Sequence, residues 1–135
     1  DAYKHELVPV AQSLYQLGLE IAPTRGTAST LLAGGIPAKV ANKVSEGRPN
    51  LVDRIKNREI NLVINIPSGR SAHRDDQVIR RAAINYNVPV VTTLSGAKAT
   101  ASAIAALQQG HLGVCSLQEY HQKIAHMENS TTRVR

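Results

Sequence analysis

Short apolar runs alternate with helix-like segments along the whole chain, and this alternation limits the fold more than any other sequence feature. Leu7, Leu14 and Leu17 recur at helical spacing and stop at Gly18. The run INLVINI at 60–66 is typical of a buried strand. The strands expected are 19–22, 38–41, 60–66, 88–93 and 112–117, and the further helices are 27–33, 49–57, about 75–85, 95–109 and 118–127. Because parallel strands need crossover connections, we predict an α/β fold: a three-layer, doubly wound, mainly parallel sheet with helices on both faces.

Two of these helices have start signals in the sequence. Pro49 is expected in the first turn of its helix, because its fixed φ suits that place. Asp75 and Asp76 suit the N-terminal turn of the next helix. His73 beside them could instead form an acid–base cluster, but helix capping explains the two acids more simply.

The size and charge of the chain bound its organisation and its partners. With 135 residues, 42% of them hydrophobic, it suits a single domain, which we assign to residues 1–126 with a polar tail at 127–135. A formal net charge of +6 favours an anionic partner, either a phosphorylated metabolite, a nucleic acid or an acidic protein surface. Helical periodicity begins almost at once, so we expect the chain to be part of a longer protein.

Cysteine usage and hydropathy indicate a cytoplasmic protein. The single cysteine, Cys115, excludes a disulfide framework and a cysteine-based zinc site, and we expect a buried, inert thiol in a reducing compartment. The apolar runs are too short to span a bilayer, and the first residues do not resemble a signal peptide. No membrane association is therefore expected.

Hydroxyl, amide and cationic residues follow the predicted strands. In open parallel sheets ligands bind beyond the carboxyl ends of the strands, which here means 24–27, 43–47, 65–71 and 92–96, with Glu46 as the only acid. The turn from Thr24 through Gly26 to Thr27 enters a helix and can offer backbone N–H groups, hydroxyls and the positive helix end to a phosphate. These residues are equally consistent with Thr27 as a plain N-cap and Gly26 as a turn glycine. Lys43 on the same edge favours the phosphate site.

The positive charge also allows an alternative function, in which the chain is a module that binds the phosphate backbone of a nucleic acid. With no Trp or Phe and four Tyr, the chain offers little stacking surface for single strands, and no helix-turn-helix or zinc-finger pattern is present. We therefore expect no nucleic acid partner and interpret the basic side chains as solvated helix faces or interdomain salt bridges. These side chains are Arg54, Lys56, Arg58, Arg80 and Arg81.

Three segments taken in order carry a family resemblance. Together they resemble the methylglyoxal-synthase-like domain at the C-terminus of the carbamoyl phosphate synthase large subunit. The segments are TRGTA, then VANKVSEGRPNLVDRIKNREINLVINIPSG, then VIRRAAINYNVPVVTTLSGAKATASAI. The resemblance runs from near Lys4 to about Ile124. In that family a strand usually precedes the first helix, so the resemblance implies a sheet that lacks one strand here.

The resemblance implies a regulatory domain of a glutamine-dependent ligase and no turnover by the domain itself. In the bacterial glutamine-dependent enzyme, the domain that this chain resembles binds nucleotide monophosphates, with UMP inhibiting and IMP activating or competing for the same place, and ornithine acts near the junction with the preceding synthetase domain. Carried over by motif, the effector site comprises Lys4, Thr24, Gly26, Thr27, Lys43, Asn65 and Ser68. Where some relatives have a threonine this chain has Pro67, which removes a hydroxyl.

The same resemblance implies partners outside this domain. They are the synthetase domains of the same subunit, which use ATP with Mg or Mn, and a small glutamine amidotransferase subunit. No cofactor is expected in this domain. Arg80 and Arg81 are candidates for the junction with the rest of the subunit or for self-association.

The sibling enzyme methylglyoxal synthase is the rival within the family. It needs a carboxylate base after a Gly-Gly loop, where this chain reads EGRPN and places Arg48. A guanidinium cannot act as that base. His73 and Asp75 roughly resemble the sibling's second catalytic loop but do not replace the missing group, so we expect no lyase turnover.

Overall fold

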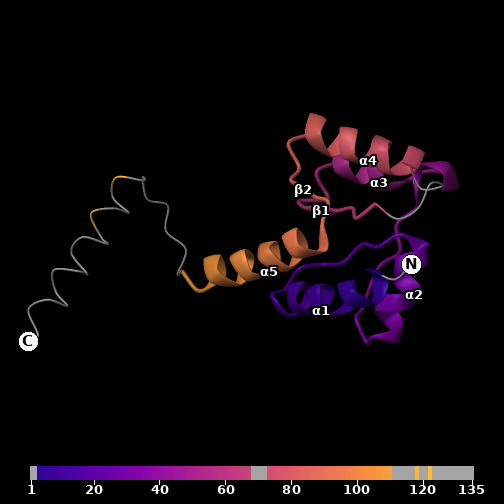
Figure 1. Ribbon diagram of the computed structural model, residues 1–135. Helices are drawn as coiled ribbons and strands as arrows, with labels where there is room; N and C mark the ends of the chain where they lie inside the picture. Colours follow the sequence, from indigo (N-terminus) through magenta and orange to yellow (C-terminus); the bar gives the residue numbers. More distant parts are fainter. Residues whose placement is uncertain (1–2, 68–72, 111–117, 119–121, 123–135) are drawn as a thin grey trace, which may run out of the picture. The chain divides into compact units, whose positions relative to one another are not determined.

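The computed structural model describes residues 3–67, 73–110, 118 and 122 (Figure 1). The chain divides into two compact units, Asp1–Ala105 and Ala106–Arg135, and the first contains the elements that matter for function. The elements are α1 (Tyr3–Gln16), α2 (Arg25–Ala33), the short 3-10 helix η1 (Val44–Glu46), α3 (Leu51–Lys56), β1 (Val63–Ile64), α4 (His73–Asn85), β2 (Val90–Val91) and α5 (Leu94–Gln108). Among the described residues, no helix is both long enough and apolar enough to cross a membrane.

Glycine ends the first helix as the sequence predicts. The N–H of Gly18 donates to the carbonyl of Tyr15 at 2.9 Å, and the N–H of Leu19 donates to that of Leu14 at 3.1 Å. Gly18 has a φ of 90°, a conformation that costs other residues energy. This pair of bonds is a Schellman motif, which satisfies carbonyls that the helix end leaves free.

The second helix starts earlier than predicted. It begins at Arg25, with Thr24 as the extended cap residue, whose side chain makes no capping hydrogen bond. The interpretation of Thr27 as an N-cap is therefore wrong, and Gly26 lies inside the first turn of α2. The backbone and hydroxyl of Thr24 are thereby placed at the positive end of this helix.

The third helix is fixed by a reciprocal cap. The side-chain oxygen of Asn50 accepts hydrogen bonds from the N–H groups of Val52 and Asp53 at 3.0 and 3.2 Å. The Asp53 carboxylate accepts the N–H of Asn50 at 2.9 Å in return. This capping box starts α3 at Leu51. Pro49, predicted in the first turn, precedes the cap instead.

Regular strand structure is shorter than predicted. β1 and β2 pair in parallel, with Val63 opposite Val90 and Ile64 opposite Val91. The predicted strands at 19–22 and 38–41 are extended segments joined by two hydrogen bonds and a parallel bridge from Thr24 to Ala41. The predicted strand at 112–117, most of the helix at 118–127, and the boundary between residues 126 and 127 lie outside the described residues.

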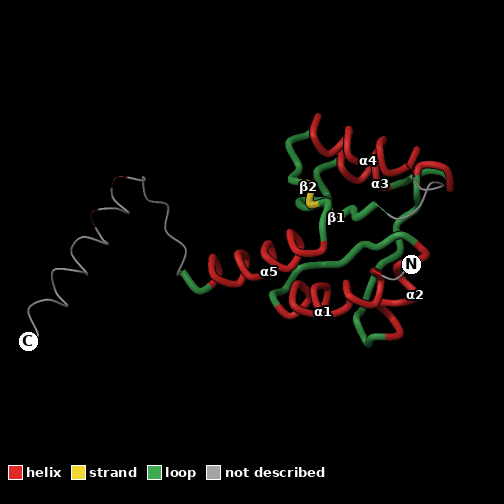
Figure 2. The backbone as a smooth tube through the Cα atoms, viewed as in Figure 1, coloured by secondary structure: helices red, strands yellow, loops and turns green. Residues whose placement is uncertain are grey.

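Alternate residues of the parallel pair face different helix layers. Val63 and Val90 pack against a buried cluster from α3 and α4, whereas Ile64 and Val91 pack against a cluster from α1 and α5. The first cluster contains Ile55, Ile79, Ala82 and Ala83, and the second contains Val10, Leu14, Ala97 and Ala101. Helices thus cover both faces of the strands (Figure 2). The predicted α/β class with parallel pairing is confirmed.

Candidate functional site

A cavity of about 810 Å³ gathers the residues that the sequence singled out. Its walls come from α1, the start of α2, η1's cap residue, α3, the β1 segment and the start of α4. Six of the seven predicted effector-site residues line it: Lys4, Thr24, Gly26, Thr27, Lys43 and Asn65. The seventh, Ser68, lies outside the described residues.

The first turn of α2 presents hydrogen-bond donors to this cavity. The N–H groups of Thr27 and Ala28 both donate to the Thr24 carbonyl at 2.9 Å, which leaves the N–H groups of Arg25 and Gly26 without a partner among the described residues. The first amides of a helix carry the positive end of its dipole. Two free amides beside the hydroxyls of Thr24 and Thr27 form a donor group suited to an oxyanion.

Lys4 lies over this turn although it belongs to another helix. A Cβ placed on Gly26 would stand 3.4 Å from the Lys4 Nζ, so the missing side chain leaves room for the ammonium group. Lys4 is half-buried near the start of α1. Only the family resemblance predicts Lys4 as a site residue, and the packing of α1 against α2 brings it to the first turn of α2.

Lys43 adds a second ammonium side chain to the cavity wall. It is half-buried and follows Ala41 and Asn42, whose bridges to Thr24 and Asn50 fix the local backbone. Its own N–H donates to the Glu46 carboxylate at 2.8 Å. Glu46 is thereby engaged with the backbone of its own turn and does not line the cavity.

Four acidic side chains line the cavity: Glu20 and Glu59, which lie near Arg54, and Asp75 and Asp76 at the start of α4. Asp75 and Asp76 lie in the first turn of α4, as predicted, but they also line the cavity. The expectation that Glu46 is the only acid on this edge is therefore wrong. One sequence feature could have indicated that Asp75 and Asp76 reach the cavity: they come directly after the loop that follows β1.

Asp75 and Asp76 each accept a hydrogen bond from a neighbouring polar side chain. Ser45 donates to Asp75 at 2.8 Å, and the Asn65 amide nitrogen donates to Asp76 at 3.0 Å. The second bond fixes which way the Asn65 amide points. Its side-chain oxygen is buried and has no hydrogen-bond partner among the described residues. A buried acceptor without a partner costs free energy, which a donor from a ligand would recover.

Pro67 follows the β1 segment at the edge of the cavity region. Pro67 is exposed and can offer no donor. His73 begins α4, but its side chain lies outside the described residues, so its interpretation as part of an acid–base cluster stays open.

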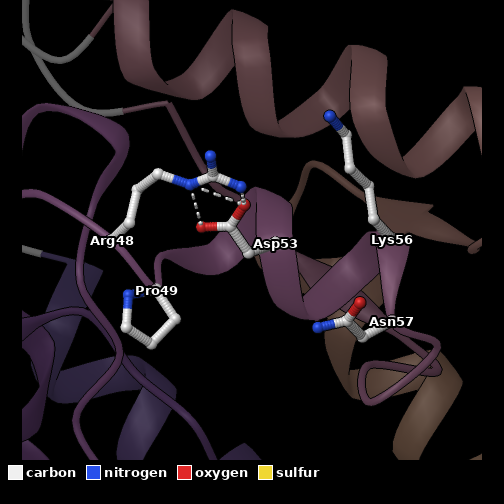
Figure 3. A pocket seen from close by; sticks show the side chains of 5 residues that line it. All are labelled: Arg48, Pro49, Asp53, Lys56 and Asn57. Atoms are coloured by element: carbon white, nitrogen blue, oxygen red, sulfur yellow. Dashed lines mark hydrogen bonds and ion pairs between the residues drawn. The ribbon is translucent and has the colours of Figure 1, made fainter.

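Arg48 lies at a separate hollow of about 300 Å³, lined by Arg48, Pro49, Asp53, Lys56 and Asn57 (Figure 3). The Arg48 Nε donates to both Asp53 oxygens at 3.1 Å, and its Nη2 forms an ion pair with the same carboxylate. The hydrogen bonds from Arg48 and from the backbone N–H of Asn50 lower the pKa of Asp53. The hydrogen bond and charge of Asp53 in turn raise the pKa of Arg48. Arg48 therefore stabilises the N-terminal cap of α3 through Asp53, and it does not line the larger cavity.

Two other basic side chains have partners within the chain. Arg54 binds Glu59 at 3.1 Å and lies 3.8 Å from Glu20. The Arg80 Nε donates to the carbonyl of Asp76 at 3.3 Å, whereas Arg81 is exposed. Arg54 is thus engaged in local ion pairs and is not displayed for a nucleic acid backbone.

Comparisons with known proteins agree with one another. The sequence model of a family described as MGS-like domain matches residues 6–92. The chain is 42% identical over 120 residues to the carbamoyl phosphate synthase large chain of Nostoc sp., and 46% identical over 121 residues to that of Acidobacterium capsulatum. These matches cover 89% and 90% of this chain but 11% of each relative.

A third relative is shorter. The chain is 45% identical over 122 residues to the carbamoyl phosphate synthase large chain, C-terminal section, of Methanopyrus kandleri, which covers 90% of this chain and 22% of that protein. The chain therefore spans between about a tenth and a fifth of the length of these relatives.

Proposed function

The chain belongs to the MGS-like domain family, and from that premise we propose that it is the regulatory domain of a glutamine-dependent carbamoyl phosphate synthase large subunit, where it binds a nucleotide monophosphate such as UMP or IMP. The observation that carries the proposal is the gathering of Lys4, Lys43 and the start of α2 in one cavity. The names of the relatives supply the parent enzyme.

The phosphate group would bind at the cationic end of the cavity. The free N–H groups of Arg25 and Gly26 and the Thr24 hydroxyl can each donate to a phosphate oxygen. Lys4 and Lys43 supply charge from half-buried positions, where Coulomb attraction is stronger than in bulk water. Charge and directed donors together favour a phosphate over a plain carboxylate.

The nucleoside would extend toward the acidic end of the cavity. Asn65 presents a buried acceptor oxygen, and Asp75 and Asp76 present carboxylates. Ribose hydroxyls and base N–H groups are donors that match these acceptors. A second phosphate would meet Asp75 and Asp76 there, so the charge pattern favours monophosphates over diphosphates.

Regulation follows from linkage between this site and the rest of the large subunit. If a nucleotide binds one arrangement of this domain against the synthetase domains more tightly, it shifts that equilibrium, and the synthetase substrates must shift nucleotide binding in return. Such couplings are typically about 1–3 kcal/mol. The parent would work in the cytoplasm with ATP, Mg or Mn and a small amidotransferase subunit, and would supply arginine and pyrimidine synthesis.

Titration calorimetry tests the binding site directly. The chain is titrated with UMP, IMP and uridine at moderate salt, alongside a Thr24→Ala/Lys43→Ala variant. A matched control is Lys39→Ala, because Lys39 is an exposed lysine that does not line the cavity. We expect saturable binding of a monophosphate that is lost with uridine and in the double variant but kept in the control. Equal binding of uridine and UMP would contradict a phosphate-anchored site.

Binding alone does not distinguish an effector site from a general phosphate-backbone site. A backbone site would bind any nucleobase equally and lose affinity steeply with salt. We expect discrimination between UMP and IMP that persists when the salt concentration is raised. Equal affinity for both with a steep salt slope would favour the backbone-binding module.

A lyase is the second candidate, because Asp75 and Asp76 line the cavity that would hold a triose phosphate. A carboxylate base is what such a proton abstraction needs. Ser45 and Asn65 hold these acids by hydrogen bonds. The family resemblance implies that Arg48 stands where the sibling enzyme has its aspartate. We expect no methylglyoxal from dihydroxyacetone phosphate, and turnover that disappears in Asp75→Asn or Asp76→Asn would overturn the regulatory assignment.

A further inference from the structure

The segment from Asn42 to Asn50 is a strap whose two ends are joined at its base. A parallel bridge pairs Asn42 with Asn50, and the N–H of Leu51 donates to the Asn42 carbonyl at 3.0 Å. The Asn42 side chain also donates to the carbonyl of Pro49 at 3.3 Å. Backbone and side-chain hydrogen bonds therefore fix the base of the strap, and residues 43–48 form the loop that this base carries.

Lys43 begins that loop and belongs to the η1 turn. It directly precedes η1, lines the cavity and is half-buried. Its N–H donates to the Glu46 carboxylate at 2.8 Å, and the N–H of Glu46 donates to the Lys43 carbonyl at 3.1 Å. These two bonds close the turn on itself. The position of the Lys43 backbone therefore follows the position of η1.

Two side chains of the strap attach it to the helices beside it. At its far end Arg48 is bound to Asp53 of α3 (Figure 3). In η1 the Ser45 hydroxyl donates to the Asp75 carboxylate of α4 at 2.8 Å, across 30 positions of sequence. In the part of the chain that the structure describes, no other hydrogen bond or ion pair joins residues 43–47 to α4. The attachment of η1 to α4 thus depends on Ser45.

Asp75 is otherwise an unfavourable residue for an anion site. Its carboxylate lines the cavity and would repel a phosphate bound beside Lys43. An acid is favoured in the first turn of α4, but that preference does not explain the bond to Ser45. Hydrogen bonds to a charged group are roughly twice as strong as those between neutral groups. A carboxylate is therefore a better anchor for the Ser45 hydroxyl than a neutral side chain.

We propose that the hydrogen bond between Ser45 and Asp75 is a latch that holds the strap in place at the cavity wall, and that Asp75 is a positioning residue for Lys43. Ser45 is exposed and does not line the cavity, so it acts through the turn and not by contact with a ligand. With the latch made, the Lys43 side chain is confined before an anion arrives, and less conformational entropy is lost on binding. The effect on monophosphate binding rests on the proposed function, whereas the latch itself does not.

Amide hydrogen exchange, followed by NMR without nucleotide, tests the latch. The full chain is compared with Ser45→Ala and with Ser45→Thr, which keeps a hydroxyl. The reporters are the Lys43 and Glu46 amides, which are hydrogen-bonded within the turn, and the reference is the Ala41 amide, which donates to the Pro23 carbonyl outside the strap. This reference separates release of the turn from a change in global stability.

We expect Ser45→Ala to speed exchange at Lys43 and Glu46 about three- to tenfold relative to Ala41, because one hydrogen bond to a charged group is lost. Ser45→Thr should keep that ratio within about twofold of its value in the natural chain, since its hydroxyl can donate to Asp75. An unchanged ratio in Ser45→Ala, or an equal rise in Ser45→Thr, would overturn the latch.

A double-mutant cycle tests whether the latch acts on the anion site. The Kd of UMP is measured by calorimetry for the chain, Ser45→Ala, Asp75→Ala and the double variant. We expect Ser45→Ala to raise the Kd about three- to tenfold in the natural background and less than about twofold where Asp75 is replaced. The direct repulsion between Asp75 and the phosphate cancels, because each comparison holds residue 75 constant. Equal effects in the two backgrounds would overturn the positioning role.

Ser13→Ala is the matched control for these titrations. Ser13 is an exposed serine whose hydroxyl donates to the carbonyl of Pro9 in its own helix, and it does not line the cavity. Its replacement should leave the Kd unchanged, and a rise equal to that in Ser45→Ala would count against a specific latch.

The two measurements separate the latch from the proposed function. Faster exchange in Ser45→Ala with no binding of UMP or IMP in any version would reject the proposed function and support the latch. Binding of UMP with unchanged exchange in Ser45→Ala would do the reverse.

Discussion

Replacing Lys43 with methionine should weaken monophosphate binding by a predictable amount. Methionine keeps an apolar stem of similar length and removes only the ammonium group. A hydrogen bond to a charged group contributes about 1.5–3 kcal/mol. Lys43 is half-buried, so water replaces part of the lost interaction and the lower half of that range applies. We therefore expect a loss of about 1.5–2 kcal/mol, or roughly 10- to 30-fold in Kd.

Calorimetry with UMP measures this loss, and Lys39→Met is the matched control. Lys39 is exposed and does not line the cavity, so its replacement removes the same net charge without removing a predicted contact. The control should change the Kd by less than about twofold, which is the long-range effect of one screened charge. An equal loss in both variants would show that Lys43 acts only through net charge, and no loss in either would remove Lys43 from the site.

Three further substitutions test other parts of the structure. Gly26→Ala should stabilise α2 by up to about 0.5–1 kcal/mol through helix propensity, because the added methyl would stand 3.4 Å from the Lys4 Nζ, an ordinary contact; thermal unfolding measures the gain, and a loss of stability would contradict this placement of Lys4. Asn50→Ala removes both cap acceptors of α3 and should cost about 1–2 kcal/mol in urea unfolding, whereas a cost near zero would mean that the cap does not limit stability. The pKa of Asp53 is lowered by its hydrogen bonds from Arg48 and the backbone N–H of Asn50, so its contribution to stability is present above the unfolded pKa, near 4, and is lost as the pH falls through the folded pKa. The stability difference between the chain and Asp53→Asn should therefore be largest near neutral pH and shrink below about pH 4, and a difference that grows on acidification would refute this reasoning.

The strands show why local sequence cannot fix pairing. Residues 19–22 and 38–41 have strand-like composition and are extended, yet regular pairing is confined to Val63–Ile64 and Val90–Val91. A strand needs at least one hydrogen-bonded neighbour, and which segment lies beside it is a property of the whole fold. The predicted run at 60–66 was correct in place and too long in extent.

The sequence by itself determined the order and approximate limits of the helices. Periodic apolar residues and a glycine stop such as Gly18 are local signals, so α1 and α5 lie within a few residues of their predicted places. It also determined that Thr24, Lys43 and Asn65 share one edge, because the ends of parallel strands meet there.

Only the tertiary structure decided what those residues meet. The approach of α1 to α2 places Lys4 over Gly26, and the first turn of α4 brings Asp76 to the Asn65 amide. These contacts join residues far apart in the sequence, and they depend on how helices pack across the strands. Side-chain packing of that kind leaves no local pattern in the chain, so the acidic end of the cavity could be recognised only in three dimensions.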